Sequence, residues 1–152
     1  MRLALYQPDI AGNTGTIIRL ATCFGLPVDI IEPCGFPFSD RQLKRSAMDY
    51  ARSARIDRRA NFEEFMAAMR REGHRIVLLT SKGSLRLPDA EFRPNDVLLM
   101  GSEGAGVPGH VREHADLSVR IPMQSEFRSL NIAVAAGIAL GEALRQTGLY
   151  PP

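Results

Sequence analysis

Long apolar runs, paired cysteines and low-complexity tracts are all missing from this sequence of 152 residues, and each absence excludes a class of protein. Residues 132–140 are all apolar or glycine, but they fall short of the roughly 20 residues that cross a bilayer. The opening MRLALYQPDIAGN has too short an apolar core, and too early a proline, for a secretory signal. We therefore expect a cytoplasmic protein with no membrane contact.

Metal-binding patterns are equally scarce. The two cysteines, Cys23 and Cys34, have no CxxC spacing, which favours reduced structural thiols over redox or metal roles. The segment from His110 to His114 fits the HxxEH pattern of inverted zinc proteases. Because no further ligand set accompanies this pattern and a glycine-rich loop lies beside it, we interpret the match as coincidence and expect no metal.

Charge is small in total but uneven along the chain. The net charge is +2, yet residues 41–59 hold seven basic and two acidic side chains, a net of +5, while the remainder carries −3. A basic segment on a slightly acidic body suggests a docking face for a polyanion such as nucleic acid, here centred on Arg41, Lys44, Arg45 and neighbouring arginines. A solvated basic helix and loop is the alternative interpretation.

Short apolar strands alternate with helices along the chain. Strands are expected at residues 2–6, 28–31, 75–80, 96–100 and 117–121. Helices are expected at residues 13–25, 40–48, 61–69, 108–114 and 129–146. No internal repeat or linker interrupts this order. The alternation predicts a single α/β domain over residues 1–152, with a mainly parallel sheet covered by helices on both faces.

Three segments begin at the carboxyl ends of expected strands, where ligands bind in parallel sheets. They are LLTSKG, LLMGSEGAG and RIPMQSEFRSLN. In the second, the glycines at positions 101, 104 and 106 do not fit GxGxxG, and no Gly-Lys-Ser/Thr follows, so neither a dinucleotide fingerprint nor a P-loop is present. Taken alone, this loop indicates either a small-ligand site or a tight turn.

The first helix opens with Asn13 as its expected cap. An apolar stripe on this helix is joined by further apolar residues around its axis, so we expect burial on more than one side. Arg19 should then lie near an interface, where arginine needs an anionic or hydrogen-bonding partner. A surface arginine on a capped helix is the alternative.

The last helix has almost no polar face between Ile132 and Leu140. One side can pack on the sheet, but the other would be an exposed apolar patch in a monomer. A twofold dimer that buries this helix, together with the first helix, is the simplest explanation; a helix wholly enclosed within one chain is the alternative. Ser129 is expected at its N-cap and Asn131 in its first turn.

The segments NTGTIIR, LLMGSEGAGVP and IPMQSEFRSLNIAVA, in that order, resemble the SPOUT superfamily of RNA methyltransferases. Within it, LALYQPDIAGNTGTIIRLA, IIEPCGFPFSDRQLKRSAMDY and the lack of a separate RNA-binding domain resemble a minimal subfamily. That subfamily methylates the ribose 2′-hydroxyl of the tRNA wobble nucleotide, a cytidine or carboxymethylaminomethyluridine. The similarity covers essentially the whole chain.

This resemblance implies an α/β fold with a C-terminal trefoil knot, S-adenosyl-L-methionine as cofactor, tRNA as substrate and a homodimer through the first and C-terminal helices. Matched by position, it implies catalytic roles for Asn13, Arg19, Ser129 and Asn131. It implies cofactor binding by Leu79, Thr80, Gly101, Glu103, Gly104, Gly106, Ile121, Met123, Ser129 and Leu130. Arg128, with the basic residues at 41, 44 and 45, is expected to contact RNA. Many relatives have a small residue or glycine where this chain has residues 124–128.

A guanidinium keeps its charge at neutral pH, so Arg19 is expected to clamp the 2′-oxygen and an adjacent phosphate rather than act as a general base. Glu103 is expected either to hold its loop or to balance the sulfonium of the cofactor. Three alternatives remain: methylation of another tRNA or rRNA ribose, a non-catalytic RNA-binding relative, and a nucleotide-binding regulator with a flavodoxin-like sheet.

Overall fold

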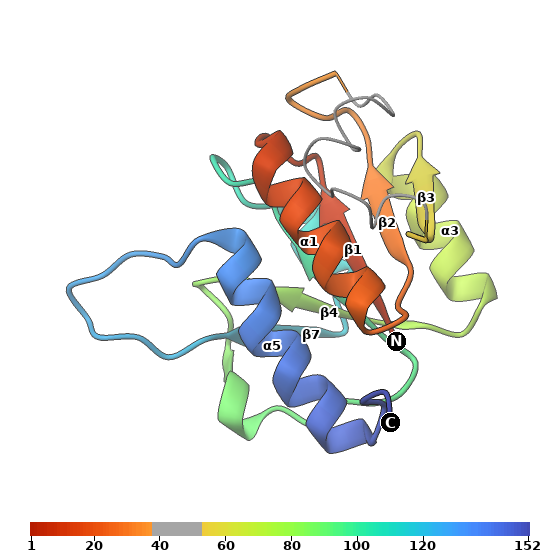
Figure 1. The fold of residues 1–152 in the computed structure, drawn as a ribbon. Helices are drawn as coiled ribbons and strands as arrows, with labels where there is room; N and C mark the ends of the chain where they lie inside the picture. The colour runs from red at the N-terminus through yellow and green to blue at the C-terminus, as the bar shows by residue number, and fades with distance from the viewer. Residues whose placement is uncertain (38–52) are drawn as a thin grey trace.

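A parallel sheet between two helical layers forms the protein (Figure 1). The computed structural model describes residues 1–37 and 53–152. In these ranges the strands are β1 (Arg2–Tyr6), β2 (Val28–Ile31), β3 (Ile56–Arg59), β4 (Arg75–Leu79), β5 (Leu85–Arg86), β6 (Asp96–Met100) and β7 (Leu117–Arg120). The helices are α1 (Ala11–Cys23), α3 (Phe62–Arg71), α4 (Gly109–Glu113), α5 (Ile132–Thr147) and a short 3-10 turn at Leu87–Asp89.

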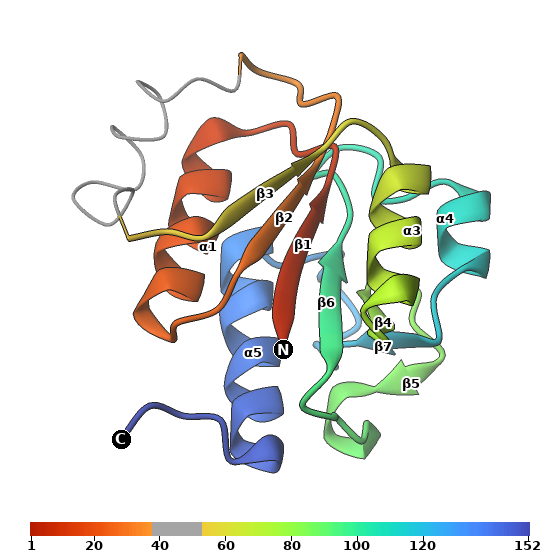
Figure 2. The same cartoon turned by 90° about the vertical axis from the view of Figure 1, so that its right-hand side faces the viewer.

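The strand order is β3-β2-β1-β6-β4-β7-β5, and every pairing in the sheet is parallel. Helices α1 and α5 lie side by side on one face, while α3 and α4 cover the other (Figure 2). Each face of the sheet carries its own hydrophobic core, and successive strand residues point alternately into one core and the other. In β1, Leu3 and Leu5 pack under α1 and α5, whereas Ala4 and Tyr6 pack under α3. Burial on both faces explains why the central strands are continuously apolar.

The expected strands are confirmed. The five predicted strands are present, and α3 is capped by Asn61, whose side chain accepts from the N–H of Glu64 at 2.8 Å. Both cysteines are free thiols. Burial, with the nearby charge of Glu32, raises the pKa of the Cys34 thiol to about 11, which keeps it protonated at neutral pH. Within the described ranges, no helix is long and apolar enough to span a membrane.

The predicted ends of two helices were wrong. Helix α1 begins at Ala11 rather than Asn13 and ends at Cys23, and its N-cap, Ile10, makes no side-chain capping bond. Helix α5 begins at Ile132, and its cap is Asn131 rather than Ser129. The Asn131 side chain accepts from the N–H groups of the first helical turn at 2.8 and 3.3 Å. A cap is chosen by where the chain turns in space, which a cap-forming residue type alone does not fix.

Strand β3 was not predicted, because its sequence is polar and lies inside the basic segment. It pairs with β2 in parallel register, with Asp57 opposite Asp29. Arg58 pairs with Glu32, and Arg59 with Asp29. Cross-strand charge pairs therefore stabilise this edge strand where apolar packing does not.

The short strand β5 and the 3-10 turn were also missed. The helix expected at residues 40–48 lies outside the described residues.

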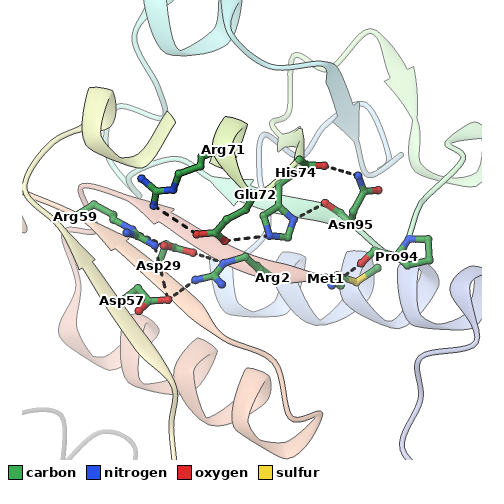
Figure 3. A network of polar contacts seen from close by, with 11 residues as sticks. Met1, Arg2, Asp29, Asp57, Arg59, Arg71, Glu72, His74, Pro94 and Asn95 are labelled. Atoms are coloured by element: carbon green, nitrogen blue, oxygen red, sulfur yellow. Dashed lines mark hydrogen bonds and ion pairs between the residues drawn. The ribbon is translucent and has the colours of Figure 1, made fainter. Parts of the chain in front are cut away.

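A network of ion pairs connects β1, β2 and β3 (Figure 3). Asp29 is fully buried, and its two carboxylate oxygens accept from Nε of Arg2 and Nε of Arg59, each at 2.7 Å. The outer carboxylate of Asp57 also pairs with Arg2. The burial of Asp29 is compensated by two arginines. None of these four residues lines the cavity described below, so the role of the network is to hold the strands together.

We expect Asp29→Asn to lower the free energy of unfolding by about 3 kcal/mol, because the change removes the buried charge that two arginines share and leaves them only the partly exposed carboxylate of Asp57. Denaturant unfolding monitored by circular dichroism measures the loss. Asp57→Asn is the matched control: Asp57 is 49 % exposed, so its loss should cost less than about 1 kcal/mol. Equal losses for the two variants would contradict a special role for the buried carboxylate.

Candidate functional site

A cavity of about 520 Å³ lies at the carboxyl ends of β4, β6 and β7. The loops that follow these strands form its walls, and the first turns of α1 and α5 complete it. The structure brings together in this cavity every residue for which cofactor binding was expected: Leu79, Thr80, Gly101, Glu103, Gly104, Gly106, Ile121, Met123, Ser129 and Leu130. Asn13 and Asn131 line it as well. Their roles toward a ligand remain predictions.

Two predicted site residues lie elsewhere. Arg19 is exposed on α1 and does not belong to the cavity lining of its own chain. It shares the exposed stripe of the helix with Gly12, Thr16 and Cys23, so a single chain does not bury α1 on more than one side as expected. Arg128 is exposed in the loop before α5 and also lies outside the lining. Arg41, Lys44 and Arg45 fall outside the described residues.

The glycine-rich loop after β6 folds back on itself. Ser102 and Gly106 exchange two backbone hydrogen bonds of 2.9 Å, which close the loop as an isolated antiparallel bridge. Gly106 has a φ of +68°, a conformation that glycine adopts without strain. A Cβ built on Gly101 would lie only 2.5 Å from the carbonyl carbon of Gly106. The backbone approach that closes this wall of the cavity therefore requires glycine at position 101.

We expect Gly101→Ala to weaken binding of a ligand in this cavity, for which the sequence resemblance implies S-adenosylmethionine, by about tenfold or more. The new methyl group forces the two arms of the loop apart at a cost of about 1–3 kcal/mol. Isothermal titration calorimetry measures the affinity. Gly109→Ala is the matched control, since a Cβ there meets no atom within 4 Å and Gly109 does not line the cavity. Unchanged affinity in Gly101→Ala would refute the requirement.

A chain of side-chain hydrogen bonds connects three parts of the cavity wall: the start of α5, the first turn of α1 and the glycine-rich loop after β6. Nδ2 of Asn131 donates to Oδ1 of Asn13 at 3.0 Å, and Nδ2 of Asn13 donates to Oε1 of Glu103 at 3.2 Å. The Glu103 carboxylate only accepts hydrogen bonds, so Asn13 must turn its NH2 group toward it. The oxygen of Asn131 accepts from helix N–H groups, so its NH2 group faces the oxygen of Asn13. Sequence positions 13, 103 and 131 are thus joined into one polar unit.

This unit favours one of the two roles expected for Glu103. Its Oε2 accepts the backbone N–H of Asp9 at 2.8 Å while its Oε1 accepts from Asn13. Both oxygens therefore hold neighbouring segments, as the loop-holding role requires. The role of Glu103 toward a cofactor stays a prediction.

Sequence reasoning missed some of the cavity lining. Ser81 and Lys82 continue the LLTSKG segment past its strand, so the strand-end rule could have included them. Arg112 reaches the cavity from α4, and no sequence signal pointed to it. In the described part of the chain, neither Lys82 nor Arg112 has an ion-pair partner.

The two histidines of the HxxEH pattern, His110 and His114, each pack edge-on against the ring of Phe62.

Fold and cavity together define an α/β protein with a cofactor-sized cavity at the carboxyl edge of a parallel sheet. The model of the SpoU rRNA Methylase family matches residues 1–141. The chain belongs to this family of methylases. Among its relatives, a protein of Beijerinckia indica subsp. indica named tRNA (cytidine(34)-2′-O)-methyltransferase is 52 % identical, over 96 % of this chain and 91 % of the relative. A protein of the same name from Ancylobacter novellus is 49 % identical, over 97 % and 94 %.

Solved structures agree with this membership. A structure described as giving "structural insights into the 2-OH methylation of C/U34 on tRNA" superposes with a TM-score of 0.90 and 39 % identity, over 95 % of this chain and 94 % of that one. An AdoMet-bound rRNA methyltransferase from Sinorhizobium meliloti gives a TM-score of 0.86 and 34 % identity, over 95 % of this chain and 55 % of that one.

Proposed function

We propose that this protein transfers a methyl group from S-adenosyl-L-methionine to the ribose 2′-hydroxyl of the wobble nucleotide of tRNA, a cytidine or carboxymethylaminomethyluridine. The observation that carries the proposal is the cavity: the residues of three separate motifs meet in it, in a chain that is 52 % identical to a tRNA (cytidine(34)-2′-O)-methyltransferase. The relatives of this name match nearly their whole length, which favours the tRNA wobble ribose over another RNA ribose.

The cavity suits a ligand with the chemistry of S-adenosylmethionine. Its lining combines apolar side chains with backbone groups of the glycine-rich loop, and Gly101 leaves no room for a Cβ. Such a wall lets a flat heterocycle lie against the backbone. The walls after β4, β6 and β7 would hold the cofactor, whose contribution is an electrophilic methyl group on a sulfonium.

The chain's own residues must align the ribose oxygen with that methyl group and stabilise its developing charge. Ser129 and Asn131, at the start of α5, are proposed to orient the hydroxyl, with Asn13 holding Asn131 in place. Arg19 is proposed as the clamp on the 2′-oxygen and its neighbouring phosphate. Since Arg19 does not line the cavity of its own chain, this role requires a second protomer or the bound RNA to bring the two together.

A homodimer through α1 and α5 is part of the proposal. Val134 and Ile138 lie one turn apart on α5 and are 52 % and 43 % exposed. Ile10, at the start of α1, is 50 % exposed, and the two helices pack side by side (Figure 1). Large exposed aliphatic side chains on adjacent helices are typical of an interface.

The C-terminal trefoil knot and the cytoplasmic location also belong to the proposal. The knot is supported by family membership and by a strand order in which β6 lies between β1 and β4, so that the chain does not fill the sheet in sequence. The location is supported by the relatives' tRNA substrate.

The RNA-docking roles of Arg41, Lys44, Arg45 and Arg128 remain proposals. Arg128 is exposed near the cavity residue Ser129, as an RNA contact requires. Arginines 55, 58 and 59 at the end of the basic segment already bond within the chain, to the Gly25 carbonyl, Glu32 and Asp29. The charges of Arg58 and Arg59 are offset by carboxylates outside the basic segment, whereas Arg55, bonded to a neutral carbonyl, keeps its full charge.

Incubation of the protein with labelled S-adenosylmethionine and total tRNA, followed by mass spectrometry of the nucleosides, tests the proposed function. We expect the label in a 2′-O-methylated ribose at the wobble position. Label at another ribose, or in rRNA, would favour the alternative methyltransferase. Binding of the cofactor without transfer would identify a non-catalytic RNA-binding relative, and affinity for a phosphorylated ligand alone would favour a nucleotide-binding regulator.

A further inference from the structure

Asp9 does not line the cavity, yet two hydrogen bonds connect it to the loop that forms the cavity wall. Its backbone N–H donates to Oε2 of Glu103 at 2.8 Å, and its own Oδ2 accepts the backbone N–H of Gly104 at 3.1 Å. The two bonds run in opposite directions between the same two segments. They form a reciprocal clamp of the kind that a capping box makes at a helix start.

Asp9 is also held from its other side. The N–H of Gly35 donates to the carbonyl of Pro8 at 2.9 Å, which places the segment after β2 against the loop after β1. A Cβ on Gly35 would lie 3.0 Å from both Cα and Oδ1 of Asp9. Asp9 is exposed, so packing in a core does not fix it. Its position is set by these contacts on two sides.

The clamp also leads to the residues proposed to act on the substrate. Glu103 receives the Asp9 N–H on one oxygen and the Asn13 amide on the other, and Asn13 in turn receives the amide of Asn131. A chain of hydrogen bonds therefore runs from Asp9, in the loop after β1, through Glu103, in the loop after β6, and Asn13 to Asn131 at the start of α5. A displacement of Asp9 changes the place of Glu103, and with it the wall of the cavity.

We propose that Asp9 is a positioning residue for the cofactor site: its carboxylate holds the turn at Glu103 and Gly104 in the place that S-adenosylmethionine requires. This role rests on the proposed function. Asp9 acts through Gly104 and Glu103 and touches no reacting atom. The role is geometric, so any side chain of the same shape that accepts a hydrogen bond from Gly104 can fulfil it.

Calorimetric titration of S-adenosylmethionine into four proteins tests the proposal: wild type, Asp9→Ala, Asp9→Asn and the control Asp89→Ala. Asp9→Ala should raise Kd about tenfold, as expected for the loss of one charge-assisted hydrogen bond. Asp9→Asn keeps an acceptor oxygen and should stay within about threefold of wild type. Asp89 is 52 % exposed and pairs with Arg86, outside the cavity, so Asp89→Ala should bind like wild type.

Steady-state kinetics separate positioning from a general structural role. In Asp9→Ala we expect KM for S-adenosylmethionine to rise about tenfold, while kcat at saturating cofactor falls by less than about threefold. Gly35→Ala tests the clamp with Asp9 intact, because its new methyl group presses on Asp9. It should shift the same KM in the same direction.

Each contrary result identifies what fails. Wild-type affinity in Asp9→Ala would refute the positioning role alone. An equal loss in Asp9→Asn and Asp9→Ala would show that charge matters and geometry does not, which also refutes it. A lower unfolding midpoint in ligand-free Asp9→Ala with no change in KM would assign Asp9 to stability. Absence of cofactor binding by the wild type would refute the proposed function, and this role with it.

Discussion

Arg19→Ala should lower kcat for methyl transfer roughly 100- to 1000-fold, the effect of removing one donor that stabilises charge developing on an oxygen. Binding of S-adenosylmethionine should be nearly unchanged, because Arg19 does not line the cofactor cavity of its own chain. Single-turnover transfer to tRNA and calorimetric titration of the cofactor measure the two quantities on the same preparation.

Two further variants make this prediction specific. Arg19→Lys keeps the charge but loses the planar fork, so it should recover only part of the rate. Arg70→Ala removes an exposed arginine from α3, on the opposite face of the sheet, and should leave transfer unaffected. Normal turnover by Arg19→Ala would remove the clamp from the mechanism. A loss of cofactor affinity equal to the loss of rate would move Arg19 into the cofactor site.

Ile138→Glu should weaken dimer formation roughly 1000-fold and abolish methyl transfer under dilute conditions. In a twofold dimer the substituted residue occurs in the interface once from each protomer. Each of the two glutamates then places an unpaired charge in an apolar contact. Sedimentation velocity across a dilution series measures association, and circular dichroism checks that the monomer remains folded. Val134→Glu, one turn earlier on the same stripe, should act in the same way.

Ala67→Glu is the matched control for the dimer, since it places the same charge on the exposed face of α3. It should leave both association and transfer unchanged. A wild-type protein that sediments as a monomer at every concentration would refute the dimer. An Ile138→Glu protein that remains a dimer would place the interface on another surface.

Strands β1, β2, β4 and β6 were predictable because each is a short, mostly apolar run, and such runs need burial on both faces. Strand β3 was not, because Arg58 and Arg59 are stabilised there by carboxylates of β2 and of the turn after it. The same residues counted toward a basic docking segment in the sequence. A count of charges does not show which of them already have partners.

The site was predicted as a set of loops, and the parallel sheet explains this success. Strand ends of a parallel sheet meet at one edge, so segments near residues 79, 101 and 129 were expected together. What each polar residue does there was less predictable. Asn13 suited a helix cap by residue type, but it lies inside α1 and bonds to Glu103 and Asn131, 90 and 118 positions away.

By itself, the amino-acid sequence determined the class of fold, the three motifs and the loops that carry them, since apolar periodicity and residue types are local properties. Only the tertiary structure decided that Asp9 clamps the glycine-rich loop, that Asn131 caps α5 and that Arg19 faces outward. The physical reason is that a hydrogen bond depends on the distance and direction between two groups. Those are fixed by the packing of the whole sheet and its helices rather than by neighbouring residues in the chain.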